Sequence, residues 1–248
     1  MIKVLVHGSN GKMGSHVIEA LSKSSTMELF CGVDKVSTGN ESYKYYSSFE
    51  NIEKKADVII DFSFHTVVKD VLDYAIKTKT PIVVATTGLT DEEKQYVASA
   101  SNKVPVFLSG NMSIGIAVLS ETAKRVASVF PNADIEIVES HHNRKVDAPS
   151  GTALMLADSI KETRPQATYK YGRGGMAKRE PNEIGIHALR MANIVGIHEV
   201  YITTDSEQIV LKHTAYDRAL FADGALKAAE FIADKSAGIY TMKDVFKS

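Results

Sequence analysis

The stretch ESHHNRKVDAPSGTAL, residues 139–154, carries side chains that can move protons and attract an anion. Its two histidines, arginine and lysine bring two to four positive charges into five residues, at His141, His142, Arg144 and Lys145. Histidine and lysine can both donate protons, and lysine is a useful acid when burial or a cationic neighbourhood lowers its pKa toward neutral. The stretch therefore predicts acid–base chemistry.

A Pro-Ser-Gly-Thr turn follows this cluster and predicts the start of a helix. The first turn of a helix offers free backbone N–H groups and a partial positive charge, so an anion can dock at Ser150, Gly151 and Thr152. The substrate is therefore expected to be anionic, such as a carboxylate.

Two other readings of the cluster are open. A solvated basic loop would explain its charges. Paired histidines could bind a metal, but no second cluster at ligand spacing supplies the carboxylates or thiolates of a zinc site, so we expect no metal. His187, His198 and His213 lie in strand-like runs, where we expect structural or interface roles.

A glycine-rich loop, in KVLVHGSNGKMGS at residues 3–15, follows an apolar run. A kinase-type phosphate loop needs Ser or Thr after its lysine and four residues between its glycines. Met13 follows Lys12, and the spacing is also too short, which excludes that loop.

The dinucleotide loop fits better, although a tight strand–helix turn alone would also use Gly8, Gly11 and Gly14. Its glycines permit a tight turn and close approach to a pyrophosphate at a helix N-terminus, here with one extra residue in the turn. Asp34 stands about 20 positions on, where an acidic residue binds the ribose hydroxyls. Lys35 could attract a 2′-phosphate, so NADH and NADPH are both candidate cofactors.

These motifs need a scaffold, and the first hundred residues alternate β-branched runs with helical patterns, which predicts a mostly parallel sheet. Residues 58–60 and 82–84 are apolar without alternation, as in strands covered on both faces. Thr90 and the acidic residues after it predict a helix start beyond Gly88. The tyrosine-rich segment 42–48 is expected to be a loop, and its Tyr43, Tyr45 and Tyr46 are expected to be a loop or interface feature.

From about residue 113 the pattern changes. A helical run at 114–130, a strand at 134–140 and three consecutive strand-like runs within 183–217 predict an antiparallel or mixed sheet. An Ala-rich helix at 218–233 could return to the first domain. We therefore expect an α/β fold with a Rossmann-type dinucleotide-binding domain, residues 1–112 plus 218–248, and an α+β substrate-binding and oligomerisation domain, residues 113–217.

Composition narrows the partners. The 248 residues have a net charge of -1, which gives no reason to expect nucleic acid. No apolar run approaches the roughly 18 residues that span a bilayer, so no membrane partner is expected. The single cysteine, Cys31, excludes an intramolecular disulfide, and the chain starts without a signal-peptide pattern, so the cytoplasm is the expected compartment.

Together the motifs resemble those of the 4-hydroxy-tetrahydrodipicolinate reductase family, formerly called dihydrodipicolinate reductases, of bacterial lysine and diaminopimelate biosynthesis. The resemblance runs nearly end to end. It covers GSNGKMG at 8–14, ATTG at 85–88, SGNMSIG at 109–115, ESHHNRKVDAPSGTA at 139–153, FADGALKAAEFI at 221–232 and GIYTMKDV at 238–245.

The resemblance implies roles for residues of this chain. His141 would be the proton donor or acceptor and Lys145 a proton donor. Substrate carboxylates would bind at the helix entry, through His142, Ser150, Gly151 and Thr152. The cofactor pyrophosphate would lie on Gly8, Ser9, Asn10, Gly11, Lys12 and Met13, its adenosine ribose on Asp34 beside Lys35, and its nicotinamide side on Ala85, Thr86, Thr87, Ser109, Gly110, Asn111 and Met112.

The implied reaction reduces 4-hydroxy-tetrahydrodipicolinate, a small dicarboxylate, with NADH or NADPH, and the family implies a homotetramer formed through the sheet of the second domain. Ala85 replaces a frequent glycine, and Asp34-Lys35 replaces a Glu-Arg pair, so the cofactor preference stays open. Two alternatives also remain: a related reductase of another dicarboxylate or amino acid, such as an aspartate dehydrogenase-like enzyme, and a non-catalytic NAD(P) sensor.

Overall fold

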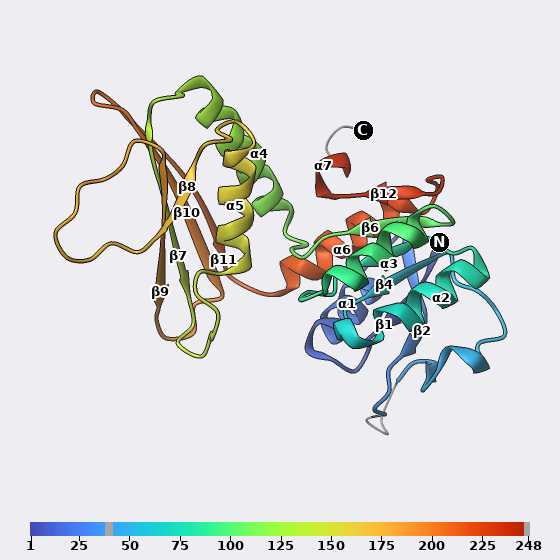
Figure 1. Ribbon diagram of the computed structural model, residues 1–248. Helices are drawn as coiled ribbons and strands as arrows, with labels where there is room; N and C mark the ends of the chain where they lie inside the picture. The colour runs from blue at the N-terminus through green and yellow to red at the C-terminus, as the bar shows by residue number, and fades with distance from the viewer. Residues whose placement is uncertain (38–41, 246–248) are drawn as a thin grey trace. The chain divides into compact units, whose positions relative to one another are not determined.

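The computed structural model describes residues 1–37 and 42–245, and Figure 1 shows its helices and strands. The chain divides into two compact units, each with its own sheet and core. The first unit comprises Met1–Ser113 together with the chain from Arg218 onward, and the second unit comprises Ile114–Asp217.

The first unit contains a seven-stranded sheet in the order β12-β6-β5-β4-β1-β2-β3, in which neighbouring strands pair in parallel. This confirms the Rossmann-type architecture. Tyr45 and Tyr46 form a short strand at the sheet edge, so the expectation of a loop throughout 42–48 was wrong at these residues. The strands are β1 Ile2–His7, β2 Met27–Val33, β3 Tyr45–Tyr46, β4 Val58–Asp61, β5 Ile82–Val84, β6 Pro105–Leu108 and β12 Gly238–Tyr240.

Helices follow the strands as the sequence pattern predicts. Helix α3 begins after Thr90, whose hydroxyl accepts the Glu93 N–H while the Glu93 side chain accepts the Thr90 N–H, a complete capping box. Helix α6 comes from the C-terminal part of the chain and packs on α1. The helices of this unit are α1 Lys12–Ser22, α2 Val68–Thr78, α3 Asp91–Ser101, α6 Ala219–Ile232 and α7 Met242–Val245, with short 3₁₀ turns at Phe49–Asn51 and His65–Val67.

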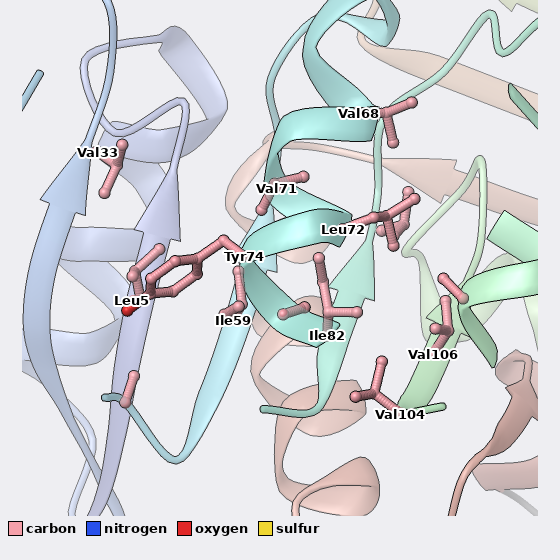
Figure 2. Packing of buried hydrophobic residues seen from close by; sticks show 14 of the residues in the cluster. Leu5, Val33, Ile59, Val68, Val71, Leu72, Tyr74, Ile82, Val104 and Val106 are labelled. Carbon is pink, nitrogen blue, oxygen red and sulfur yellow. The ribbon is translucent and has the colours of Figure 1, made fainter. Parts of the chain in front are cut away.

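Figure 2 shows the apolar core between the sheet and α2, where Leu5, Ile59 and Ile82 from three adjacent strands meet Val71 and Leu72 from the helix. All five side chains are fully buried. Because strands covered on both faces lose every exposed position, continuous apolar runs are the expected sequence of β4 and β5. Strand β1 lies between β4 and β2, so the strand order changes direction next to β1. In this architecture ligands bind at such a point, outside the carboxyl ends of the strands.

The second unit has a mixed five-stranded sheet in the order β11-β10-β7-β9-β8, as expected for an α+β domain. Strand β7 occupies the centre, antiparallel to β10 and parallel to β9, although β9 and β10 are consecutive in the chain. Helices α4 and α5 pack together beside this sheet (Figure 1). The elements are α4 Ile114–Val129, β7 Asp134–His141, α5 Gly151–Lys161, β8 Thr168–Tyr171, β9 Glu183–Arg190, β10 Gly196–Thr203 and β11 Gln208–Ala215.

Candidate active site

The glycine loop of the first unit makes a close turn between β1 and α1. Gly8 has a φ of 77°, and a Cβ on it would lie 2.8 Å from Phe62 O; a Cβ on Gly14 would lie 2.1 Å from Gly8 O. Both positions therefore require glycine. Helix α1 begins at Lys12 with Gly11 as its N-cap and no capping side chain, which leaves backbone N–H groups for an anion.

Asp34 ties this loop to the end of β2. Its Oδ2 accepts the Asn10 N–H at 3.1 Å, and its backbone oxygen accepts the Tyr45 hydroxyl at 2.5 Å. The Tyr43 hydroxyl donates to Asn10 Oδ1 at 2.8 Å. The tyrosines of the segment 42–48 therefore brace the predicted ribose-binding residue. Lys35 is exposed beside Asp34.

The remaining predicted cofactor residues follow two other strands at the same edge of the sheet. Ala85, Thr86 and Thr87 follow β5, and Thr86 is buried while Thr87 is exposed. Ser109–Met112 follow β6, where the Ser109 hydroxyl donates to Asn111 O at 2.6 Å. The first unit thus gathers its predicted residues at the carboxyl edge of one parallel sheet, the usual position of a dinucleotide.

A nicotinamide dinucleotide fits these residues. The glycine turn permits close backbone approach, and the uncapped start of α1 can receive phosphates. Ser9 Oγ is buried and has no hydrogen-bond partner in the described part of the chain, so it can form a hydrogen bond with a ligand.

In the second unit, the fully buried carboxylate of Glu139 is the centre of the basic cluster. It accepts two hydrogen bonds at 2.8 Å from the Arg190 guanidinium and one at 3.0 Å from the Ser150 N–H, and His141 Nδ1 lies 2.5 Å from its Oε2. Burial alone would raise the pKa of Glu139, but these partners outweigh it and hold the pKa at about 2. Glu139 is therefore ionised at every physiological pH.

His198 lies against the same cluster. Its ring centroid is 5.2 Å from that of His141, and its Nε2 lies 3.2 Å from Ser150 Oγ. Burial, helped by the charges of His141 and Lys145, lowers the pKa of His198 to about 3. His198 is consequently a neutral hydrogen-bonding group at neutral pH, part of the cluster rather than only the structural residue that its strand position predicted.

Helix α5 starts where the Pro-Ser-Gly-Thr turn predicted. Ser150 is its N-cap, and the Ser150 hydroxyl accepts the Ala153 N–H at 3.2 Å. Gly151 is exposed and Thr152 is half-buried. Because Ser150 already bonds Glu139, Ala153 and His198, it holds the start of the helix, and Gly151 and Thr152 form the first turn after it.

The positively charged side chains of the cluster have different partners. Lys145 Nζ lies 2.9 Å from Asp147 Oδ1, an anion where the sequence suggested cationic surroundings. Burial would raise the pKa of Asp147, but its hydrogen bond and ion pair with Lys145 lower it. Arg144 instead donates to Asn193 Oδ1 at 2.9 Å. His142 is half-buried next to His141.

The structure thus brings the predicted residues into two groups, one in each unit. Sequence reasoning missed Glu139 and Arg190 as members of the second group and undervalued His198. Within residues 1–37 and 42–245, no three His, Cys, Asp or Glu side chains are grouped to hold a metal ion. No helix in the described part of the chain is long and apolar enough to cross a membrane.

Comparison with known proteins identifies relatives along the whole chain. Residues 2–112 match the family model "Dihydrodipicolinate reductase, N-terminus", and residues 115–246 match "Dihydrodipicolinate reductase, C-terminus". The second match continues past residue 218, where the chain has returned to the first unit.

Individual relatives agree with the family models. The 4-hydroxy-tetrahydrodipicolinate reductase of Caldanaerobacter subterraneus is 46% identical over 100% of this chain and 99% of its own length. A dipicolinate-bound dihydrodipicolinate reductase from Paenisporosarcina sp. TG-14 superposes with a TM-score of 0.83 at 26% identity, over 97% of both chains. An aspartate dehydrogenase from Thermotoga maritima, at 14% identity and a TM-score of 0.55 over 95% of this chain and 98% of its own, shares the fold alone.

Proposed function

The chain belongs to the dihydrodipicolinate reductase family, and from this premise we propose how its residues reduce 4-hydroxy-tetrahydrodipicolinate. The reaction is an NAD(P)H-dependent reduction in lysine and diaminopimelate biosynthesis. It consumes one hydride and one proton and releases tetrahydrodipicolinate and water. The observation that carries the residue assignments is the buried Glu139, which holds His141 next to the N-terminus of α5.

The first unit is the dinucleotide-binding domain in this proposal. NADH or NADPH supplies the hydride when bound. Gly8–Met13 hold its pyrophosphate through the loop backbone and the start of α1, Asp34 accepts the adenosine ribose hydroxyls, and Lys35 lies where a 2′-phosphate would need a cation. Ala85–Thr87 and Ser109–Met112 hold the nicotinamide side.

The second unit binds the substrate. The two carboxylates of the substrate need positive charge and N–H donors, which His142 and the first turn of α5, at the exposed Gly151 and the half-buried Thr152, supply. Ser150 acts by capping that turn, and its bonds to Glu139 and His198 keep the turn in place. The aligned donors orient the ring before reaction.

The proton steps belong to His141 and Lys145. Lys145 donates a proton to the ring carbon once the hydride has been delivered. His141 is a further proton donor or acceptor, through its Nε2. Glu139 beside Nδ1 orients the imidazole. Arg190 in turn fixes both oxygens of Glu139.

We also propose a homotetramer that assembles through the sheet of the second unit and works in the cytoplasm. Leu189 on β9 and Val210 on β11 are each nearly half exposed on that sheet, which a subunit contact would cover. Sedimentation equilibrium tests the assembly: a tetramer is expected, and a monomer at micromolar concentration contradicts it.

Two alternatives are tested by the same assay. NADH and NADPH oxidation is followed by absorbance with freshly generated 4-hydroxy-tetrahydrodipicolinate, with and without pyridine-2,6-dicarboxylate. The proposal predicts substrate-dependent oxidation and competitive inhibition. Cofactor binding without oxidation would indicate a sensor, and oxidation only with another dicarboxylate or amino acid would indicate a related reductase.

A further inference from the structure

A second buried carboxylate lies in the first unit, outside the residues proposed for the cofactor and the substrate. Asp61 ends β4 and is fully buried. Its Oδ1 accepts the Ser63 N–H at 3.1 Å and the Ser63 hydroxyl at 2.6 Å and lies 2.8 Å from His7 Nδ1. Its Oδ2 accepts the Thr86 hydroxyl at 2.7 Å. One side chain thus meets donors from the ends of three strands.

Each partner of Asp61 starts a different loop at the carboxyl edge of the sheet. His7 directly precedes Gly8 of the glycine loop, Ser63 follows β4, and Thr86 follows β5. Further contacts connect these loops, because the Ala85 N–H donates to Asp61 O at 2.9 Å and the Thr86 hydroxyl oxygen also lies 3.1 Å from Ser63 O. Two of the three loops are those assigned to the cofactor.

The chemistry of a buried carboxylate makes this junction stiff. A carboxylate can accept several hydrogen bonds at once through its two oxygens, and in a low dielectric each of these bonds is short and strong. An uncompensated buried charge is costly, so the donors stay in place together. Moving either cofactor loop alone would break bonds to Asp61.

We infer that Asp61, with His7, is a positioning residue that sets the glycine loop and the Thr86–Thr87 loop at the spacing the dinucleotide requires. The inference rests on the proposed function, since it takes those loops as the cofactor site. Asp61 itself is buried beneath the loops and acts through Thr86, Ser63 and His7.

The test measures NADH binding by fluorescence titration and compares it with turnover. Asp61→Asn replaces one acceptor oxygen by an NH₂ donor. This donor would face groups that are themselves hydrogen-bond donors. The dissociation constant for NADH is expected to rise ~10–100-fold, the scale of one lost charge-assisted hydrogen bond, while the KM for the ring substrate at saturating cofactor changes less than about 3-fold. Asp73→Asn, on the exposed face of α2, is the matched control and should leave NADH binding unchanged.

A second pair of variants keeps the test decisive if Asp61→Asn does not fold. His7→Leu removes the group next to Asp61, and His7→Asn retains an N–H near the position of Nδ1. NADH affinity is expected to fall about 10-fold in the first and to recover to within about 3-fold of wild type in the second. A purely structural role would lower the melting temperature of His7→Leu and leave NADH affinity unchanged, which would overturn the inference.

A double-mutant cycle tests whether Asp61 acts through Thr86. Thr86→Val removes the hydroxyl, and adding Asp61→Asn to it should weaken NADH binding less than Asp61→Asn does in the wild-type protein, because only the bonds to His7 and Ser63 are then left to lose. Losses that multiply would contradict coupling through Thr86. NADH binding is measured without substrate, so the outcome for Asp61 is separate from the outcome of the turnover assay that tests the proposed function.

Discussion

Replacing Glu139 by glutamine keeps the shape of the side chain and removes the charge that three donors share. In the folded protein the pKa of Glu139 is about 2, against an ordinary value of 4.5. A carboxyl with a lowered pKa stabilises the fold above its unfolded pKa, and this stability disappears as pH falls toward the folded value. This lowered pKa corresponds to about 3 kcal/mol of stability at neutral pH.

We therefore expect Glu139→Gln to lower the free energy of unfolding by about 3 kcal/mol, and the melting temperature by ~6–12 °C. The effect on catalysis should be larger. Without the carboxylate, His141 loses the acceptor that fixes its tautomer and orientation, and kcat should fall ~10²–10⁴-fold. NADH binding should stay within about 3-fold of wild type, because its site lies in the first unit.

The assay combines steady-state turnover, NADH titration and thermal unfolding on the same preparations. Glu207→Gln, in an exposed turn of the second unit, makes the same charge change away from the cluster and should behave as wild type. If folded Glu139→Gln turned over within about 3-fold of wild type, Glu139 would have no part in orienting His141.

Two further predictions concern the cofactor and pH. Asp34→Ala should weaken NADH more than NADPH, because only NADH relies wholly on ribose hydroxyls; equal losses in titration would remove Asp34 from that role. For His198, whose pKa burial lowers to about 3, the unfolded chain binds a proton below about pH 6.5 and the folded chain does not. The contribution of His198 to the free energy of unfolding should thus be nearly constant well above pH 6.5 and about 1.4 kcal/mol lower at pH 5.5. His213, with a pKa also lowered by burial, adds to this drop, and urea denaturation of His198→Asn should show the loss of His198's share; an unchanged drop would contradict its neutral state.

The elements of both units were largely predictable because their signals are local. The Thr90 capping box and the Ser150 turn fall where α3 and α5 begin, and apolar runs without alternation mark β4 and β5. Strand order in the second unit was not predictable, since β7 inserts between the consecutive strands β9 and β10. Pairing between distant strands depends on tertiary packing that the local pattern does not carry.

The residues of the candidate site were likewise predictable where the signal was local and not where it depended on strand pairing. The glycine loop and the His141–Lys145 cluster are contiguous in sequence, so their residue types alone predicted chemistry. Glu139 stands two residues before His141, and the period of a strand puts both side chains on one face, a signal that could have been used. Arg190 lies opposite His141 in the sheet, and His198 lies opposite Glu139. These positions depend on the register of β7 with β9 and β10, which only the folded sheet shows.

We propose that the second unit supplies the acid for the reduction of 4-hydroxy-tetrahydrodipicolinate. Single-turnover oxidation of bound NADPH by this substrate tests it most directly, in wild type, in Lys145→Ala and in Lys170→Ala, which changes an exposed lysine on β8. We expect a rate ~10²–10⁴-fold lower for Lys145→Ala alone, with NADPH binding intact. An equal rate in all three proteins would contradict it.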